Sequence, residues 1–254
     1  MNIDSRSKLN RLLKNTINGG LLFSEWLKQN GYSDQLLRQY RQSQWLSSLA
    51  GGVMYRSGDK LSAIACLQSF NTQLNKHYRI AALSALELFG YNHYVPMGKP
   101  VMTVFNDGSH SPEWLKSDKF DRTIKVFSTK TFLKTSTETV DYEGVKTLVS
   151  SPEQAFLECL LLAEKMYSFT DLYYVLEQLT SLRPELLQTI LENTDSQKVK
   201  RMFLYMAEKS GHYWFDALDL QKISLGTSKL QLVKGGCYIP KYKIIVPVEL
   251  ENYE

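Results

Sequence analysis

The segment that most constrains the fold is residues 21–59, LLFSEWLKQNGYSDQLLRQYRQSQWLSSLAGGVMYRSGD. We expect Ser24 to cap a short helix that carries Trp26 and Leu27. Gly31 follows at the position where a left-handed residue usually ends a helix. The segment therefore opens with one short helix and a tight turn.

A second helix is predicted directly after this turn. Ser33 or Asp34 is expected to cap it, and it should run to about Gln44, with an inward face made of Leu36, Leu37 and Tyr40. The dipeptide Gly51-Gly52, between Trp45-Leu46 and Val53-Met54-Tyr55, favours a hairpin turn with positive φ. Helix, turn, helix and hairpin in this order predict a winged helix-turn-helix.

The outward face of the second helix carries side chains that can read DNA bases, namely Gln35, Arg38, Gln39, Arg41 and Gln42. Arginine can bind guanine, and glutamine can bind adenine, through two hydrogen bonds in the major groove. Lys28, Ser33 and the wing residue Arg56 could hold phosphates. The alternative interpretation is an ordinary solvated helix face.

Charge is distributed unevenly along a chain whose net charge is only +4. Residues 1–60 carry nine Lys/Arg and four Asp/Glu, giving +5, whereas residues 107–195 carry nine and fifteen, giving −6. A basic first segment suggests a polyanionic partner. With 43% apolar residues, no apolar run long enough to span a membrane and no signal peptide, we expect a cytoplasmic protein.

The remainder of the chain predicts a mixed α+β domain, so we divide the chain into residues 1–78 and 79–254. Strands are expected near 101–105, 124–127 and on both sides of Tyr142-Glu143-Gly144. A capping box, Ser151 with Gln154, should start a buried helix. The further expected elements are helices at about 61–74, 78–89, 170–182, 184–193 and 196–209, and a terminal hairpin of residues 229–233 and 238–247 about Gly235-Gly236.

Signatures of enzymes and metal sites are missing from the sequence. There is no HExxH, P-loop, GxSxG or GxGxxG motif, so we expect no enzyme and no cofactor. The histidines, at positions 77, 93, 110 and 212, are isolated, and His93 and His212 stand beside aromatic residues, which favours packing over metal binding. Three widely spaced cysteines, at positions 66, 159 and 237, are expected to be free thiols.

A second basic cluster follows in the C-terminal half. Lys198, Lys200 and Arg201, with Lys209 at the edge, alternate with apolar residues, so we expect them on the solvent side of an amphipathic helix. A plain solvated face is one interpretation. The other is a surface that binds a partner.

Several blocks together resemble the AbiEi-type antitoxins of bacterial type IV toxin–antitoxin systems, which also act in phage abortive infection. The blocks follow the family's order over nearly the whole chain and are Trp26-Leu27, Gly31, Tyr40, Thr72-Gln73-Leu74, residues 85–88, Gly90-Tyr91, His93-Tyr94, residues 150–155, residues 179–184, residues 198–201, residues 203–205, residues 207–209, residues 241–244 and Val246-Pro247. This sequence has Gln154 where the family often has arginine, so a contact made by that arginine cannot be transferred.

The resemblance implies an N-terminal winged helix that represses its own operon by binding inverted repeats in the promoter. It also implies a C-terminal antitoxin domain that counters a nucleotidyltransferase-like toxin, without necessarily forming a stable complex. The second basic cluster, Lys198, Lys200, Arg201 and Lys209, is then the candidate antitoxin surface of the C-terminal domain. We expect a monomer that assembles on DNA. Two other functions remain open: a regulator whose larger domain senses a ligand, and a nucleic-acid-processing enzyme targeted by a winged helix.

Overall fold

The computed structural model describes residues 3–91, 98–106, 108 and 110–252, with side chains from residue 7 onward. The chain divides into two compact units, each made of separate stretches of sequence. Unit 1 comprises residues 1–79, 96–128 and 139–148, and unit 2 comprises residues 80–95, 129–138 and 149–254. The chain therefore crosses between the two units five times.

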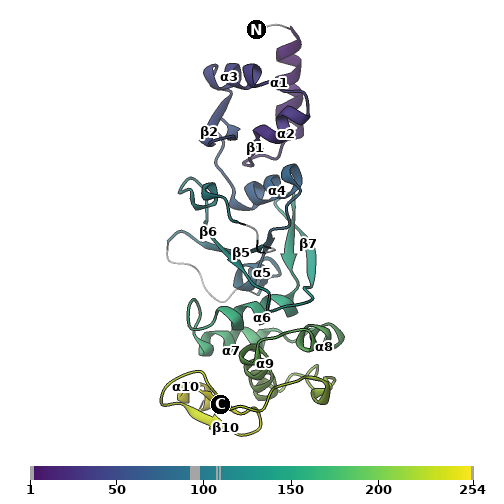
Figure 1. The fold of residues 1–254 in the computed structure, drawn as a ribbon, viewed down its shortest axis with the longest axis vertical. Coiled ribbons are helices and arrows are strands. Elements are labelled where there is room, and N and C mark those ends of the chain that lie inside the picture. The colour runs from purple at the N-terminus through teal and green to yellow at the C-terminus, as the bar shows by residue number, and fades with distance from the viewer. Residues whose placement is uncertain (1–2, 92–97, 107, 109, 253–254) are drawn as a thin grey trace. The chain divides into compact units, whose positions relative to one another are not determined.

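Unit 1 begins with the segment that the sequence singles out, and its elements follow the predicted order (Figure 1). The elements are α1 (Ile3–Asn15), β1 (Leu22–Phe23), α2 (Ser24–Gln29), α3 (Asp34–Gln42), β2 (Leu46–Ala50), β3 (Val53–Arg56), α4 (Ala63–Leu74), β5 (Val101–Asn106), the 3-10 helix η1 (Glu113–Lys116) and β6 (Thr123–Ser128). β4 (Arg79–Ile80), β7 (Thr137–Tyr142) and β8 (Val145–Ser150) each cross the boundary between the units.

A winged helix forms because the apolar faces of α1, α2 and α3 close over one side of a small sheet. The sheet has three strands in the order β1-β3-β2, and all its pairs are antiparallel. Leu27, Leu37, Tyr40 and Met54 are buried together in its core. The expected hairpin about Gly51-Gly52 is confirmed, and Gly52 has φ +75°.

The predicted caps of the two short helices differ in outcome. Ser33 caps α3 as expected, because its side chain accepts a hydrogen bond from the Leu36 amide. Ser24 does not cap α2, because the helix already begins at Ser24 and Phe23 occupies the cap position without a side-chain bond. Gly31 ends the turn with φ +83°, as expected.

Unit 1 also contains residues far along the sequence from the winged helix. β5 and β6 are parallel neighbours, in register from Val101↔Thr123 to Asn106↔Ser128. Between them, the ring centroid of Trp114 lies 5.6 Å from that of Phe23 and 5.1 Å from that of Phe70. These contacts join residues 96–128 to β1 and α4 in one core, which the division at residue 78 did not anticipate.

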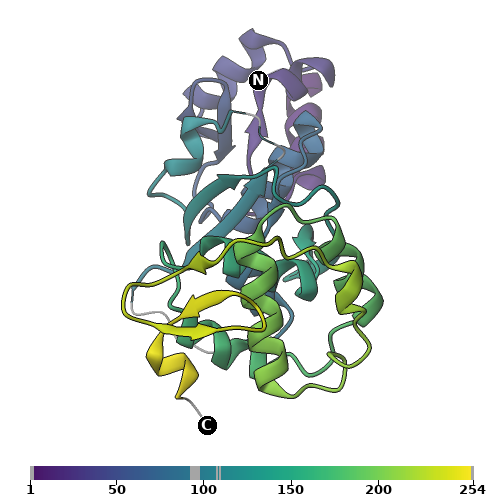
Figure 2. The same ribbon diagram turned by 60° about the horizontal axis from the view of Figure 1, so that its bottom comes forward.

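The elements of unit 2 are mainly helices. They are α5 (Ala82–Leu88), α6 (Pro152–Leu162), α7 (Phe169–Gln178), α8 (Pro184–Glu192), α9 (Gln197–Ser210), the 3-10 helix η2 (Leu220–Lys222), β9 (Leu230–Gln231), β10 (Cys237–Ile239), β11 (Ile244–Val246) and α10 (Val248–Glu251). Figure 2 shows the C-terminal strands in yellow beside the green helix α9.

The centre of unit 2 is α6, whose residues are almost all buried, as its apolar sequence predicts. Ser151 caps the helix by accepting a hydrogen bond from the Gln154 amide. The second half of the predicted capping box is not formed, because Gln154 Oε1 accepts from the Ser136 amide instead. Gln154 Nε2 donates to the buried Glu158, so this side chain links α6 to a neighbouring loop.

The predicted terminal hairpin is wrong in its pairing. β9 pairs with β11 in parallel, through Leu230↔Ile244, rather than with the strand after Gly235-Gly236. The antiparallel partners are β10 and β11, which the turn at residues 240–243 connects. The glycine pair therefore lies in the connection between two strands that are not hydrogen-bonded neighbours.

Candidate nucleic-acid interface

The outward face of α3 is exposed, as its sequence predicts. All five candidate base-reading residues are solvent-exposed: Gln35, Arg38, Gln39, Arg41 and Gln42. The opposite face is fixed, since Leu37 and Tyr40 are 2% and 0% exposed. A helix anchored on one side can present the other side to a major groove without reorganising its backbone.

The residues expected to contact phosphates are partly used within the protein. Lys28 Nζ lies 2.9 Å from Asp34 Oδ1, and both side chains are exposed, so this pair costs little to open. The Ser33 hydroxyl accepts the bond that caps α3, although the residue is exposed. Both residues therefore contact the first turn of α3.

Arg56, the wing residue expected to hold a phosphate, is half-buried and makes hydrogen bonds within the protein. Its guanidinium donates to Asn18 Oδ1 at 2.7 Å, to Thr16 Oγ1 at 2.8 Å, and to the carbonyl of Leu13. These bonds tie β3 to the end of α1. Arg56 therefore braces the winged helix while it stays half-exposed, and its phosphate contact stays a prediction.

Sequence reasoning missed an open polar groove of about 570 Å³ that begins at Arg41. The edge strand β2 and the outer side of β3 line it, and Lys119, from the loop before β6, completes it. No local pattern marks Lys119, because its approach to β3 depends on the packing of residues that lie far apart in sequence. The one sequence feature related to the groove is the basic composition of residues 1–60, and Lys119 lies outside those residues.

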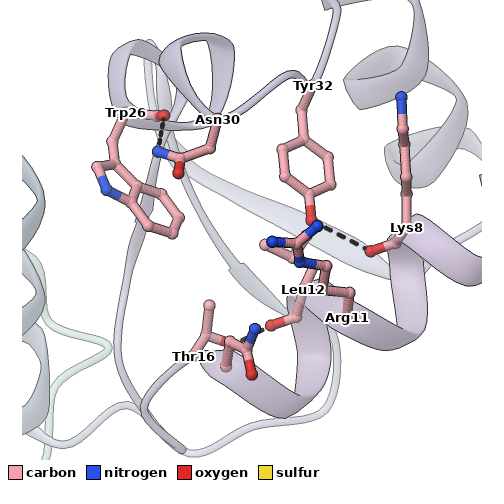
Figure 3. Close-up of a pocket in the computed structure, with 8 residues that line it drawn as sticks. Lys8, Arg11, Leu12, Thr16, Trp26, Asn30 and Tyr32 are labelled. Atoms are coloured by element: carbon pink, nitrogen blue, oxygen red, sulfur yellow. Dashed lines mark hydrogen bonds between the residues drawn. The ribbon is translucent and has the colours of Figure 1, made fainter.

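A second hollow of about 180 Å³ lies between α1 and α2 (Figure 3). Tyr32 Oη donates to the Lys8 carbonyl at 3.2 Å, and Asn30 Nδ2 donates to the Trp26 carbonyl at 2.8 Å. Its volume is below the ~300–1,000 Å³ that is usual for small-molecule sites. Because these donors already bond to the protein, the hollow serves the packing of α1 against the rest of the winged helix.

The second basic cluster is not the exposed face that the sequence predicts. Lys200 and Arg201 are 4% and 1% exposed. Arg201 donates to three backbone carbonyls, those of Leu225, Ser228 and Lys243. Lys200 Nζ donates to the Ser224 carbonyl at 3.0 Å. The prediction is wrong for these two residues because the C-terminal segment covers this side of α9 and supplies carbonyl acceptors.

The other two members of the cluster are partly exposed but engaged. Lys198 Nζ lies 3.1 Å from Glu164 Oε2 and donates to the Ala163 carbonyl at 3.2 Å. Lys209 Nζ donates to the Glu251 carbonyl at 3.1 Å. The four residues therefore hold the C-terminal half together instead of forming one continuous basic surface.

Two of the cysteines and His212 are packed among other side chains in the part of the chain that the structure describes. No group of three or more His, Cys, Asp or Glu side chains is placed to bind a metal there. Burial raises the pKa of the Cys66 and Cys159 thiols, which makes both poor nucleophiles. His212 packs against Trp214 as expected, and His93 lies outside the described residues.

Comparison with known families agrees with this architecture. Residues 5–97 match a family described as the N-terminal domain of the AbiEi antitoxin transcriptional regulator. Residues 99–247 match a family described as a transcriptional regulator, AbiEi antitoxin, of type IV toxin–antitoxin systems. The chain belongs to the AbiEi antitoxin family. The resemblance noted in the sequence and the mixed α+β class with an N-terminal and a larger C-terminal domain are thereby confirmed.

Solved structures share the fold of this AbiEi chain. The RV2827C protein from Mycobacterium tuberculosis superposes with a TM-score of 0.66 at 15% sequence identity, covering 96% of this chain and 92% of that one. No curated protein sequence matches the chain. Among the described residues of this AbiEi protein, no helix is both long and apolar enough to cross a membrane.

Proposed function

We propose that this AbiEi protein represses its own operon by binding inverted repeats in the promoter through α3. The observation that carries the proposal is the exposed face of α3, on which Arg38 and Arg41 stand beside glutamines. Arginine and glutamine are the side chains that most often read guanine and adenine edges. Membership of a family of transcriptional regulators supports the same function.

Two copies of the chain should occupy one operator, because each chain carries one such helix and an inverted repeat presents two half-sites. The wing and the Lys28 side chain would contact the backbone on both sides of the groove. We propose that the protein is a monomer in the absence of DNA and assembles on the operator. A stable dimer in sedimentation without DNA would contradict this part of the proposal.

The test of DNA binding uses the full chain and a promoter fragment. Arg38→Ala with Arg41→Ala should weaken operator binding by about 1–3 kcal/mol for each arginine that reads a base, and should relax specificity at those positions. The matched control is Lys130→Ala with Lys134→Ala, which removes the same charge from exposed residues outside α3. Equal operator binding by both double variants would show that Arg38 and Arg41 of α3 do not recognise DNA.

We propose further that the chain counters a nucleotidyltransferase-like toxin, and that this activity belongs to residues 79–254. The support is membership of an antitoxin family whose model matches residues 99–247. Protection of the cell against the toxin should therefore survive when the chain can no longer bind its operator. The direct experiment is co-expression of the toxin with the Arg38→Ala, Arg41→Ala variant of the full chain.

Full protection by a variant that no longer binds the operator is the expected result. Loss of protection in a folded variant would show that toxin neutralisation depends on operator binding. This result would contradict the assignment of neutralisation to residues 79–254 alone. A full-chain variant is preferable to a fragment beginning near residue 79, because residues 96–128 pack with the winged helix in unit 1.

A further inference from the structure

We propose that Lys119 binds the phosphate backbone of DNA, so that the DNA-binding surface continues from α3 onto the loop before β6. The proposal rests on the proposed function and extends it to a residue outside the winged helix. Lys119 and Arg41 line the same groove, together with Ser47, Ser48 and Tyr55.

The position of Lys119 is defined by its contact with the wing. Its Nζ donates to Tyr55 Oη at 3.2 Å and lies 5.3 Å from the centroid of the same ring. Tyr55 belongs to β3 and pairs directly with Ser47 of β2. A lysine has three donors, so the contact with one hydroxyl leaves Lys119 able to bond to a phosphate oxygen as well.

The loop that carries Lys119 is anchored to the start of α4 and to the residues just before it. Asp121 Oδ1 accepts from the Ala63 amide at 2.7 Å, and the Asp121 amide donates to the Leu61 carbonyl at 3.0 Å. Phe120 is 2% exposed. Because its neighbours are fixed to the end of the winged helix, Lys119 is presented as a preorganised part of that surface.

The chemistry of the groove matches a phosphodiester backbone. Its lining residues include two cations, Arg41 and Lys119, and four hydroxyl groups, those of Ser47, Ser48, Tyr55 and Ser57, but no carboxylate. Hydroxyl and cationic side chains supply most contacts between proteins and DNA phosphates. The nearby Asp121 carboxylate accepts from a backbone amide of α4, which turns it toward the protein.

The experiment measures binding of the full chain to its promoter fragment and to an unrelated duplex at several salt concentrations. Each phosphate contact contributes about −0.9 to the slope of log affinity against log salt, so Lys119→Ala should lower the slope by about one. At ~0.15 M salt this corresponds to an affinity about fivefold weaker, on both duplexes alike. Lys119→Arg should keep the wild-type slope, because it keeps the charge.

The matched control is Lys116→Ala. Lys116 is an exposed cation three residues earlier that pairs with Glu113 at 3.0 Å and does not line the groove. If Lys119→Ala and Lys116→Ala have the same affinity and slope, Lys119 does not contact DNA. If the wild type shows no preference for its promoter, the proposed repression fails, whereas the slopes on the unrelated duplex still decide the role of Lys119.

Discussion

Helices α3 and α9 carry similar basic residues but place them in opposite environments. Arg41 of α3 is exposed at the mouth of a groove, whereas Arg201 of α9 is 1% exposed and donates to backbone carbonyls. The difference comes from what packs beside each helix. The outward face of α3 is exposed, with the open groove beginning at Arg41, while the C-terminal segment of unit 2 covers the basic side of α9.

This difference shows that a basic helix face is not by itself a binding surface. A guanidinium offers five donors in a planar arrangement, which suits loop carbonyls as well as base edges or phosphates. The same side chain can thus organise a loop or recognise a ligand. Unfolding measurements show how much each cation contributes to the stability of the fold.

The largest effect is expected for the buried arginine. Arg201→Met should lower the free energy of unfolding by about 2–4 kcal/mol, because three carbonyls lose a charged donor. Arg41→Met should change stability by less than ~0.5 kcal/mol, since Arg41 is an exposed surface residue. Urea unfolding of the two variants measures the contrast, and equal losses would mean that the two environments do not differ.

An intermediate effect concerns Lys200 and depends on pH. Burial lowers the pKa of this lysine below its usual 10.5, with nearby Asp195 acting in the opposite direction. A lowered pKa means that the unfolded chain holds the proton more tightly than the folded protein does. The contribution of Lys200 to the free energy of unfolding is therefore complete above pH 10.5, and it declines as the pH falls through the pKa of the folded state.

The stability of the wild type relative to Lys200→Met should therefore increase between about pH 8 and about pH 10. Unfolding by urea at the two pH values measures this difference, and Lys28→Met serves as the control because Lys28 is exposed. A difference that is independent of pH for Lys200→Met would indicate that its ammonium group is well solvated.

The smallest effect is expected at the end of α9. Lys209 lies in the last turn, where a cation favours the helix dipole, and it donates to the Glu251 carbonyl. Lys209→Ala should cost less than ~1 kcal/mol in thermal or urea unfolding, because the contact is exposed. A loss as large as that of Arg201→Met would make Lys209 a second structural anchor of the C-terminal segment.

The winged helix could be predicted from the sequence because its signals are local. Ser33 caps α3, Gly31 takes the left-handed conformation before it, and Gly51-Gly52 turns the hairpin. Each of these features depends on residues within one or two turns of chain. The exposed face of α3 follows from the same helical period that buries Leu37 and Tyr40.

The features that the sequence did not reveal depend on contacts between distant residues. The burial of Arg201 requires carbonyls of residues 225, 228 and 243, and the groove requires Lys119 to reach Tyr55. The pairing of β9 with β11 is parallel, and a parallel pair cannot be joined by a tight turn at a glycine dipeptide. Local periodicity carries no information on such contacts.

The five crossings of the chain between its two units have a consequence for how this protein can be taken apart. In a protein with a single linker, one protease cut releases two independent domains. Here a cut at one crossing, for instance between residues 128 and 129, leaves stretches of each unit joined to the other by uncut chain. A nicked protein of this kind should remain one particle in size-exclusion chromatography and yield two fragments only after denaturation.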